Sequence, residues 1–213
     1  MGVPVLILGN SGSGKSASMR NFNPDEVGIF NVASKPLPFR NKLKSVNGSD
    51  YGTIINVLKA NKSKKYVIDD SQYLLAFEQL ARAKEMGYQK YTDMGLHFTS
   101  LVQTVINCTS DDTIVYFLHH TERGDDGSVK AKTVGKMIDN WLTLEGLFTI
   151  VLLAWTDGKK HLFITQSDGQ TTAKSPMEMF SIEIDNDLKM VDDTIRAYYG
   201  MGVATRENKA KAK

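Results

Sequence analysis

A glycine-rich run near the start of the chain has the residue types and spacing needed to bind phosphate. The run fits the pattern G-x-x-x-x-G-K-[ST] without a mismatch. Its eight residues are Gly9, Asn10, Ser11, Gly12, Ser13, Gly14, Lys15 and Ser16. Glycines let backbone N–H groups turn toward an anion, and a helix beginning near Lys15 would direct its positive end there. We therefore expect Lys15 to contact the β and γ phosphates of a nucleoside triphosphate and Ser16 to ligate Mg²⁺.

Two adjacent carboxylates follow a short apolar run at residues 66–68. A carboxylate at the tip of a buried strand can hold magnesium, directly or through water, and Asp69 is predicted to do so. Asp70 is then placed to orient or deprotonate the water that attacks the γ-phosphate. The alternative for Asp70 is structural, because Asp is a favoured N-cap and a helix is predicted directly after it.

Polar residues also follow the apolar run at 113–118. His120 and Glu122 are predicted to face the γ-phosphate and to sense it, with His119 behind them. For each histidine the alternative is a hydrogen bond to a loop carbonyl. The loop at 35–38 contains two prolines, which would hold it stiff, either across the nucleotide or as a rigid connection.

Lysines beyond a Gly-Asp-Asp-Gly turn at 124–127 are candidates for action between subunits. Lys132 or Lys136 is predicted to reach the γ-phosphate of a neighbouring subunit, where it would stabilise transition-state charge as an arginine finger does. One alternative is a solvated hairpin whose lysines serve solubility. Another is contact with the backbone of single-stranded DNA, which also needs aromatic platforms.

The elements that must position these residues are short apolar strands alternating with helices. Strands are predicted at 3–8, 27–32, 66–68, 113–118, 149–154 and 161–166. Helices are predicted from 15, and at 51–60, 72–86, 94–108 and 190–199. Asp157 and Gly158 indicate a hairpin between the last two strands. The pattern predicts an α/β fold with a mostly parallel sheet covered on both faces and a C-terminal β-hairpin.

The bulk composition fits one globular domain. The chain has 213 residues, 41% of them hydrophobic, a formal net charge of +2 and one cysteine. This balance of charge does not by itself indicate a nucleic-acid binder, and one cysteine excludes an intramolecular disulfide. We expect one domain at 1–200, a basic flexible tail at 201–213, no membrane association and a cytoplasmic location.

The class of nucleotide follows from motifs that are missing. A guanine reader needs N-K-x-D, but residues 61–64 lack its aspartate and residues 165–168 lack its lysine. A small nucleotide kinase needs an arginine-rich lid, whereas the long polar segment at 121–133 contains only Arg123. The sequence therefore favours ATP as the ligand and water as the acceptor of the phosphoryl group.

The pattern as a whole resembles the RecA-like ATPase core. More closely, it is similar to small P-loop proteins of bacteriophages described as ATP-binding or RecA-like single-strand annealing proteins. Besides the phosphate-binding run, the segments that carry the resemblance are 29–32, 35–39, 67–70, 132–137 and 144–148. It covers about residues 3 to 200.

The resemblance implies an ATP- and Mg²⁺-dependent protein that acts on single-stranded DNA in phage recombination or replication, within the host bacterial cytoplasm. It also implies rings or filaments with ATP between neighbouring subunits, and a single-strand binding protein is a further candidate partner. RecA-type recombinases usually place a glutamate after the second strand, but residues 32–35 contain no acid. Asp70 then becomes the water activator, or hydrolysis is slow. The alternatives are a helicase-loading or DNA-packaging ATPase and a non-hydrolysing module in which ATP locks an oligomer.

Overall fold

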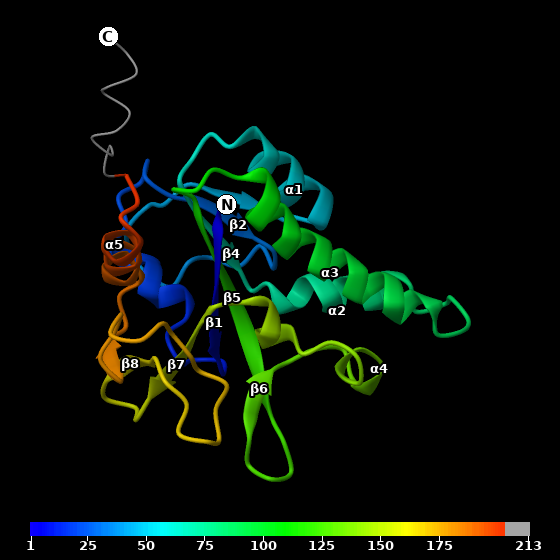
Figure 1. Cartoon of the computed structure of the whole chain (residues 1–213). Coiled ribbons are helices and arrows are strands. Elements are labelled where there is room, and N and C mark those ends of the chain that lie inside the picture. The colour runs from blue at the N-terminus through cyan, green and yellow to red at the C-terminus, as the bar shows by residue number, and fades with distance from the viewer. Residues whose placement is uncertain (203–213) are drawn as a thin grey trace.

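Nine strands form one mixed sheet in the computed structural model, which describes residues 1–202 (Figure 1). They are β1 (Val3–Gly9), β2 (Gly28–Asn31), β3 (Ser45–Asn47), β4 (Lys65–Asp69), β5 (Ile114–Arg123), β6 (Val129–Ala131), β7 (Ile150–Thr156), β8 (His161–Ile164) and β9 (Glu183–Asp185). The order is β3-β2-β4-β5-β1-β7-β8-β9, with β6 paired to β5. All pairs from β3 to β7 are parallel, while β8, β9 and β6 join antiparallel. The predicted α/β class, the mostly parallel sheet and the β7–β8 hairpin are confirmed.

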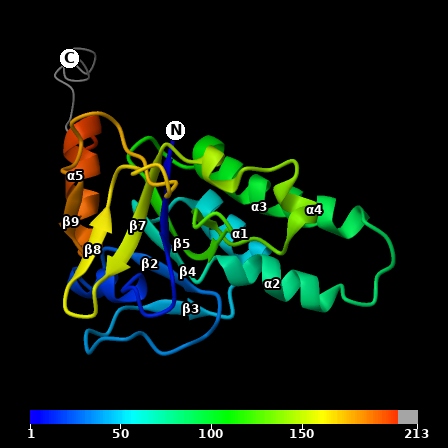
Figure 2. The same cartoon turned by 90° about the horizontal axis from the view of Figure 1, so that it is seen from below.

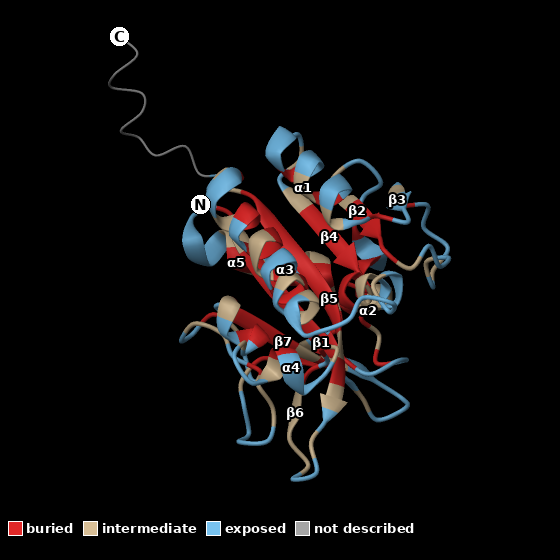
Figure 3. Cartoon of the chain, turned by 90° about the vertical axis from the view of Figure 1, so that its right-hand side faces the viewer, coloured by how far each residue is buried: buried red, intermediate tan, exposed pale blue. Residues whose placement is uncertain are grey.

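Helices cover both faces of this sheet (Figures 1 and 2). One face carries α1 (Tyr51–Ala60), α2 (Gln72–Ala81), α3 (Gln89–Cys108), α4 (Lys136–Asp139) and the short 3₁₀ helix η2 (Leu144–Leu147). The other carries the 3₁₀ helix η1 (Ser16–Asn21) and α5 (Leu188–Tyr199). The central strands are buried on both sides, as Figure 3 shows. Burial on both faces explains why β1, β4 and β5 read as continuous apolar runs.

Local sequence signals account for the helix ends. Asp50 caps α1, since its carboxylate accepts a hydrogen bond of 2.7 Å from the backbone N–H of Thr53. Asn61 ends that helix in the left-handed conformation. Ile54 and Leu58 lie four residues apart on one face of α1, and both pack into the core. The observed bounds of α1 are those predicted from the sequence.

The helix predicted from Lys15 onward differs from the one that the structure contains. The chain forms only the six-residue 3₁₀ helix η1 there, and Phe22 is already extended, with φ −68° and ψ 147°. Phe22 is buried in the core, and Pro24 disfavours helical backbone at Asn23. The contribution of a helix dipole to anion binding is therefore smaller than expected.

The segment at 121–133 is a second correction. The strand predicted at 113–118 continues as β5 to Arg123 and forms a hairpin with β6. Helix α2 ends at Ala81, five residues early, and α3 begins five residues early at Gln89. The three-residue strands β3 and β9 were not predicted.

The limits of the description bear on two expectations. None of the helices within residues 1–202 combines the length and apolar character that a membrane span requires. The predicted basic tail at 201–213 lies outside the described residues, apart from Met201 and Gly202.

Candidate functional site

The carboxyl ends of β1, β4 and β5 meet at one edge of the sheet. Register pairs Gly9 at the end of β1 with His120 on β5, and Ile68 on β4 with Phe117 on β5. Parallel strands bind ligands at this edge, where the loops that follow neighbouring strands converge. The fold thus brings the glycine-rich run, Asp69 and Asp70, and His120 together, as the sequence predicts.

The glycine-rich run curves around a cavity of about 270 Å³. The residues that line it are Ser11, Gly12, Gly14, Lys15, Ser16, Ala17, Lys35, Pro38, Asp70, His120 and His161. Gly12 and Gly14 have φ of 80° and 96°, which favours glycine over residues with a Cβ. A Cβ on Gly9 would lie 2.3 Å from the Ser13 hydroxyl oxygen. The loop therefore needs glycine at these positions.

Lys15 is buried, and its ammonium group is held by its own loop. Nζ donates hydrogen bonds to the backbone carbonyls of Gly9 at 2.7 Å and Asn10 at 3.0 Å. Burial lowers the pKa of Lys15 to about 8, although Asp70 and Asp69 raise it in part. An incompletely compensated cation at this position has a strong tendency to pair with an anion.

Ser16 and Asp69 form the second pair of the site. The Ser16 hydroxyl donates a hydrogen bond of 2.7 Å to Asp69 Oδ1. Burial raises the pKa of Asp69, and the Ser16 hydrogen bond opposes that rise. No group of three metal-ligating His, Cys, Asp or Glu residues occurs in residues 1–202. Mg²⁺, however, is commonly bound by one or two carboxylates together with phosphates and water, so this pair fits that ion.

Asp70 lies beside two cationic or titratable side chains. Lys35 Nζ is 2.5 Å from Oδ2. His120 Nε2 lies 3.2 Å from Oδ1. Burial raises the pKa of Asp70, but His120 and Lys35 outweigh that effect and the pKa is lowered overall. Ser71 occupies the N-cap position of α2, so the structure does not favour the capping alternative for Asp70.

The two histidines at the end of β5 have different surroundings. His119 is fully buried, donates from Nε2 to the Lys132 carbonyl at 2.8 Å and accepts from the Ser71 hydroxyl at 2.9 Å. Burial lowers the pKa of His119 to about 4, so the ring is neutral. The carbonyl-bonding alternative therefore describes His119, whereas His120 lines the cavity.

Three predicted residues are not brought into this cavity. Glu122 pairs with Lys130 at 3.0 Å on the β5–β6 hairpin, because β5 continues as a strand beyond His120. Lys132 and Lys136 are exposed, and neither lines the cavity. A role for either lysine in a neighbouring subunit stays a prediction.

Residues from the C-terminal part of the chain complete the site, and sequence reasoning missed them. His161 Nδ1 lies 3.2 Å from the Ser13 carbonyl oxygen. Asn186 is 2% exposed, and its amide lies against Gly14, where a Cβ would approach both amide atoms to 3.2 Å. No motif marks these residues, since they reach the loop only through the pairing of β7, β8 and β9.

Comparison of the chain with models of known families and with curated proteins finds no match. The function must therefore be argued from the site itself.

Several buried polar atoms around the glycine-rich run make no hydrogen bond within residues 1–202, although one of them, His120 Nε2, lies 3.2 Å from Asp70 Oδ1. They are Ser13 Oγ, His120 Nε2, and both Oδ1 and Nδ2 of Asn186. Buried polar groups are nearly always hydrogen-bonded, and each exception requires an explanation. Three such side chains lie around one loop together with the buried Lys15. This arrangement fits the binding of a polar, anionic ligand.

Proposed function

We propose that this protein binds ATP with Mg²⁺ and hydrolyses it slowly, on a RecA-like P-loop fold. The observation that carries the proposal is the pairing at the sheet edge. The buried Lys15 ammonium lies on the glycine-rich loop, and the Ser16 hydroxyl contacts the Asp69 carboxylate at the end of β4. These are an anion-binding group and a cation-binding pair side by side, which is what a magnesium–triphosphate complex requires.

The phosphates would replace contacts that the protein now makes with itself. The two carbonyl oxygens that accept from Lys15 belong to the loop, and phosphate oxygens are stronger, charged acceptors for the same ammonium. The unpartnered Ser13 hydroxyl and Asn186 amide can donate to further phosphate or sugar oxygens. Lys35 lines the same cavity and adds a second positive charge.

Ser16 and Asp69 are the residues that would hold the magnesium ion. When bound, Mg²⁺ neutralises part of the phosphate charge. The chain contributes the hydroxyl and the carboxylate in contact, so little rearrangement of these side chains is needed. Asp69 is buried, which limits the access of competing water to its carboxylate.

Hydrolysis would use Asp70 to hold the attacking water. The water oxygen bonds to the γ-phosphorus while the bond from that phosphorus to the bridging oxygen breaks, leaving ADP and inorganic phosphate, and the proton that the water loses passes to a phosphate oxygen or to solvent. The lowered pKa of Asp70 keeps it anionic, so it orients the water as an acceptor and is a weak base. Slow turnover follows from this weak basicity and from the ion pair with Lys35.

Action on single-stranded DNA during phage recombination or replication is the further part of the proposal, and it is supported by the resemblance of the sequence. Assembly into a ring or filament belongs to it. The exposed Lys132 and Lys136 side chains are free of the cavity of their own subunit, as a contribution to a neighbour's site requires.

The direct test of this function is ATP turnover measured alone, with single-stranded DNA and with duplex DNA. We expect stimulation by single strands over duplex, and loss of turnover in Lys15→Ala. Stimulation by duplex alone would instead favour a packaging ATPase. Equal turnover in all three conditions would contradict the DNA part of the proposal.

A second experiment separates hydrolysis from ATP-dependent assembly. Asp70→Asn should reduce turnover by about 10²-fold or more while retaining ATP binding. Lys15→Ala should abolish ATP-dependent assembly on single strands in a gel-shift assay. Unchanged turnover in Asp70→Asn would remove Asp70 from the mechanism. A parent protein that assembles but never releases phosphate would be a non-hydrolysing module.

A further inference from the structure

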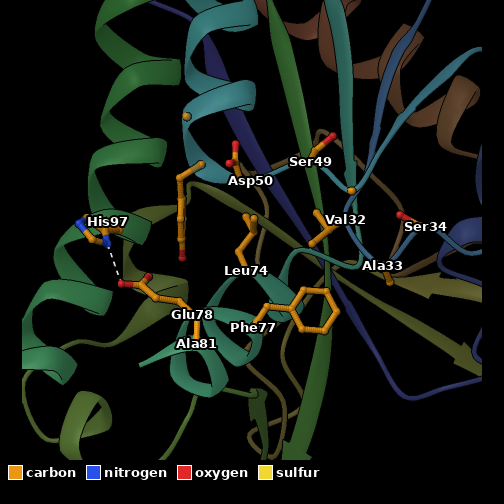
Figure 4. Close-up of a pocket in the computed structure, with 13 residues that line it drawn as sticks. Val32, Ala33, Ser34, Ser49, Asp50, Leu74, Phe77, Glu78, Ala81 and His97 are labelled. Atoms are coloured by element: carbon orange, nitrogen blue, oxygen red, sulfur yellow. Dashed lines mark hydrogen bonds and ion pairs between the residues drawn. The ribbon is translucent and has the colours of Figure 1, made fainter. Parts of the chain in front are cut away.

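A second cavity, of about 610 Å³, lies apart from the phosphate cavity and shares no lining residue with it. It lies between the amino end of α1, helices α2 and α3, and the segment that follows β2 (Figure 4). Figure 4 shows Leu74 and Phe77 between the Glu78–His97 pair on one side and Val32 on the other. Cavities of this size with largely apolar walls hold small organic molecules.

Two of the residues that line this cavity carry a buried polar atom with no hydrogen-bond partner in the part of the chain that the structure describes, Tyr51 Oη and Glu78 Oε2. Burial raises the pKa of Tyr51, and the Glu78 charge raises it further, so the phenol stays protonated. The carboxylate oxygen can only accept, whereas the phenol can accept or donate. An occupant that satisfies both atoms therefore brings at least one hydrogen-bond donor.

The charged residues that line the cavity determine which charge the donor group of the ligand should carry. Of the thirteen lining residues, the carboxylates are Asp50 and Glu78, and none is Lys or Arg. Asp50 is already used, because it accepts from the backbone of α1.

The other oxygen of Glu78, Oε1, contacts His97 at 2.9 Å and Arg82 at 3.2 Å. Arg82 also pairs with Glu85 and Asp93, so one guanidinium serves three carboxylates. The Lys90 ammonium donates hydrogen bonds to the backbone carbonyls of Arg82 and Glu85, so it places one further positive charge nearby. The carboxylates remain in excess, and a cationic donor is favoured.

We propose that this cavity binds a small molecule with a protonated amine on an aromatic or branched apolar body. The ammonium group contacts Glu78 Oε2 and Tyr51 Oη, and the apolar body packs between Leu74, Phe77 and Val32. A carboxylate or phosphate on the same body is rejected by the two acidic side chains, so this is not a second nucleotide site.

Tryptamine and indole-3-propionate test the proposal, because they share the indole and differ in the sign of the charged group. Each is titrated into the ¹⁵N-labelled protein without nucleotide, and amide shifts are followed by NMR. Tryptamine is expected to shift amides of the cavity, including those of Gly48 and Gly52, in a saturable way. Indole-3-propionate is expected to bind at least about tenfold more weakly.

Variants locate the amine. Glu78→Gln and Tyr51→Phe should each weaken tryptamine binding, the first by about tenfold or more. Glu85→Gln is the matched control, since Glu85 pairs with the same Arg82 but does not line the cavity, and it should change affinity by less than about threefold. Tyr51→Phe removes a single oxygen and keeps the test valid if Glu78→Gln fails to fold.

Three results would overturn the proposal. The first is no saturable shift with tryptamine up to about 10 mM. The second is equal binding of the acid, and the third is binding that survives both cavity variants in folded protein.

Discussion

At the scale of single residues, the site is defined by polar groups that are buried without full compensation. Lys15 and Asp69 are both pushed by burial toward their neutral forms, and Asp69 contacts Ser16, the residue next to Lys15. A ligand that carries both negative charge and a divalent cation would restore favourable charge to each. Burying these two ionisable groups costs stability in the folded protein, and the proposed nucleotide binding gives a reason for their burial.

His119 makes a prediction about acid stability. Its folded-state pKa of about 4 lies below the ordinary value of 6.5, so the folded protein favours the neutral ring. Stability is therefore full above pH 6.5 and is lost as the pH falls from 6.5 toward 4, by up to about 3 kcal/mol. Urea unfolding of the parent and of His119→Gln across this range measures the loss.

The His119→Gln variant should lose less stability over the same pH range, since its side chain does not titrate. His97→Gln is the matched control, because His97 is half-exposed, and it should keep the acid sensitivity of the parent. Identical pH profiles for the parent and His119→Gln would contradict the account of His119.

Asn186 makes a prediction that separates function from stability. Its buried amide has no hydrogen-bond partner among residues 1–202, so Asn186→Leu, which keeps a similar shape, should stabilise the nucleotide-free protein by about 1–3 kcal/mol. The same variant should show a smaller rise in Tm on adding ATP and Mg²⁺, because a ligand contact is lost. Thermal unfolding with and without nucleotide measures both effects. A less stable variant with an unchanged nucleotide-induced shift would show that Asn186 is structural.

At the scale of elements, α5 is fixed to the sheet by one buried carboxylate. Asp192 is fully buried and contacts Arg196 at 2.7 Å, Lys65 at 2.8 Å and Tyr116 Oη at 2.9 Å. Through this contact the carboxyl-terminal helix is joined to β4 and β5, the strands that carry Asp69 and His120. The loop before α5 then holds Asn186 against the glycine-rich run.

Asp192→Ala should destabilise the protein by about 3–5 kcal/mol, since it leaves two partly buried cations and a buried phenol without their partner. Asp193→Ala is the neighbouring control. Its carboxylate is largely exposed and lies 3.7 Å from Lys189, so a change below about 1 kcal/mol is expected. Denaturant unfolding measures both, and similar losses in the two variants would contradict this role of Asp192.

At the scale of the whole molecule, the sequence predicted the sheet well and its edges poorly. Buried parallel strands are continuous apolar runs, so β1, β2, β4 and β7 and the start of β5 were found near their observed bounds. Strands β3 and β9 have three residues each, too short for a period to be recognised, and they form because a sheet edge is available. The extension of β5 depends on pairing with β6, a three-residue strand that follows it after the turn at 124–128 and is itself too short for a period to be recognised.

The same contrast holds for the candidate site. The phosphate-binding run and the two aspartates can be recognised in the sequence from their motif and position, because phosphate and magnesium chemistry restricts the residue types that can bind them. The short η1 helix was not predicted, since burial of Phe22 and the effect of Pro24 act after the motif ends. His161 and Asn186 join the loop only through tertiary contacts, so no spacing in the sequence indicates them.

The most direct test of the central claim is calorimetric titration of ATP with Mg²⁺ into the parent protein and into Lys15→Ala. The account predicts saturable binding at one site per chain in the parent, and an affinity lower by about 10- to 100-fold in the variant. Absence of binding to a parent sample shown to be folded by circular dichroism, or equal affinity in the two proteins, would contradict it.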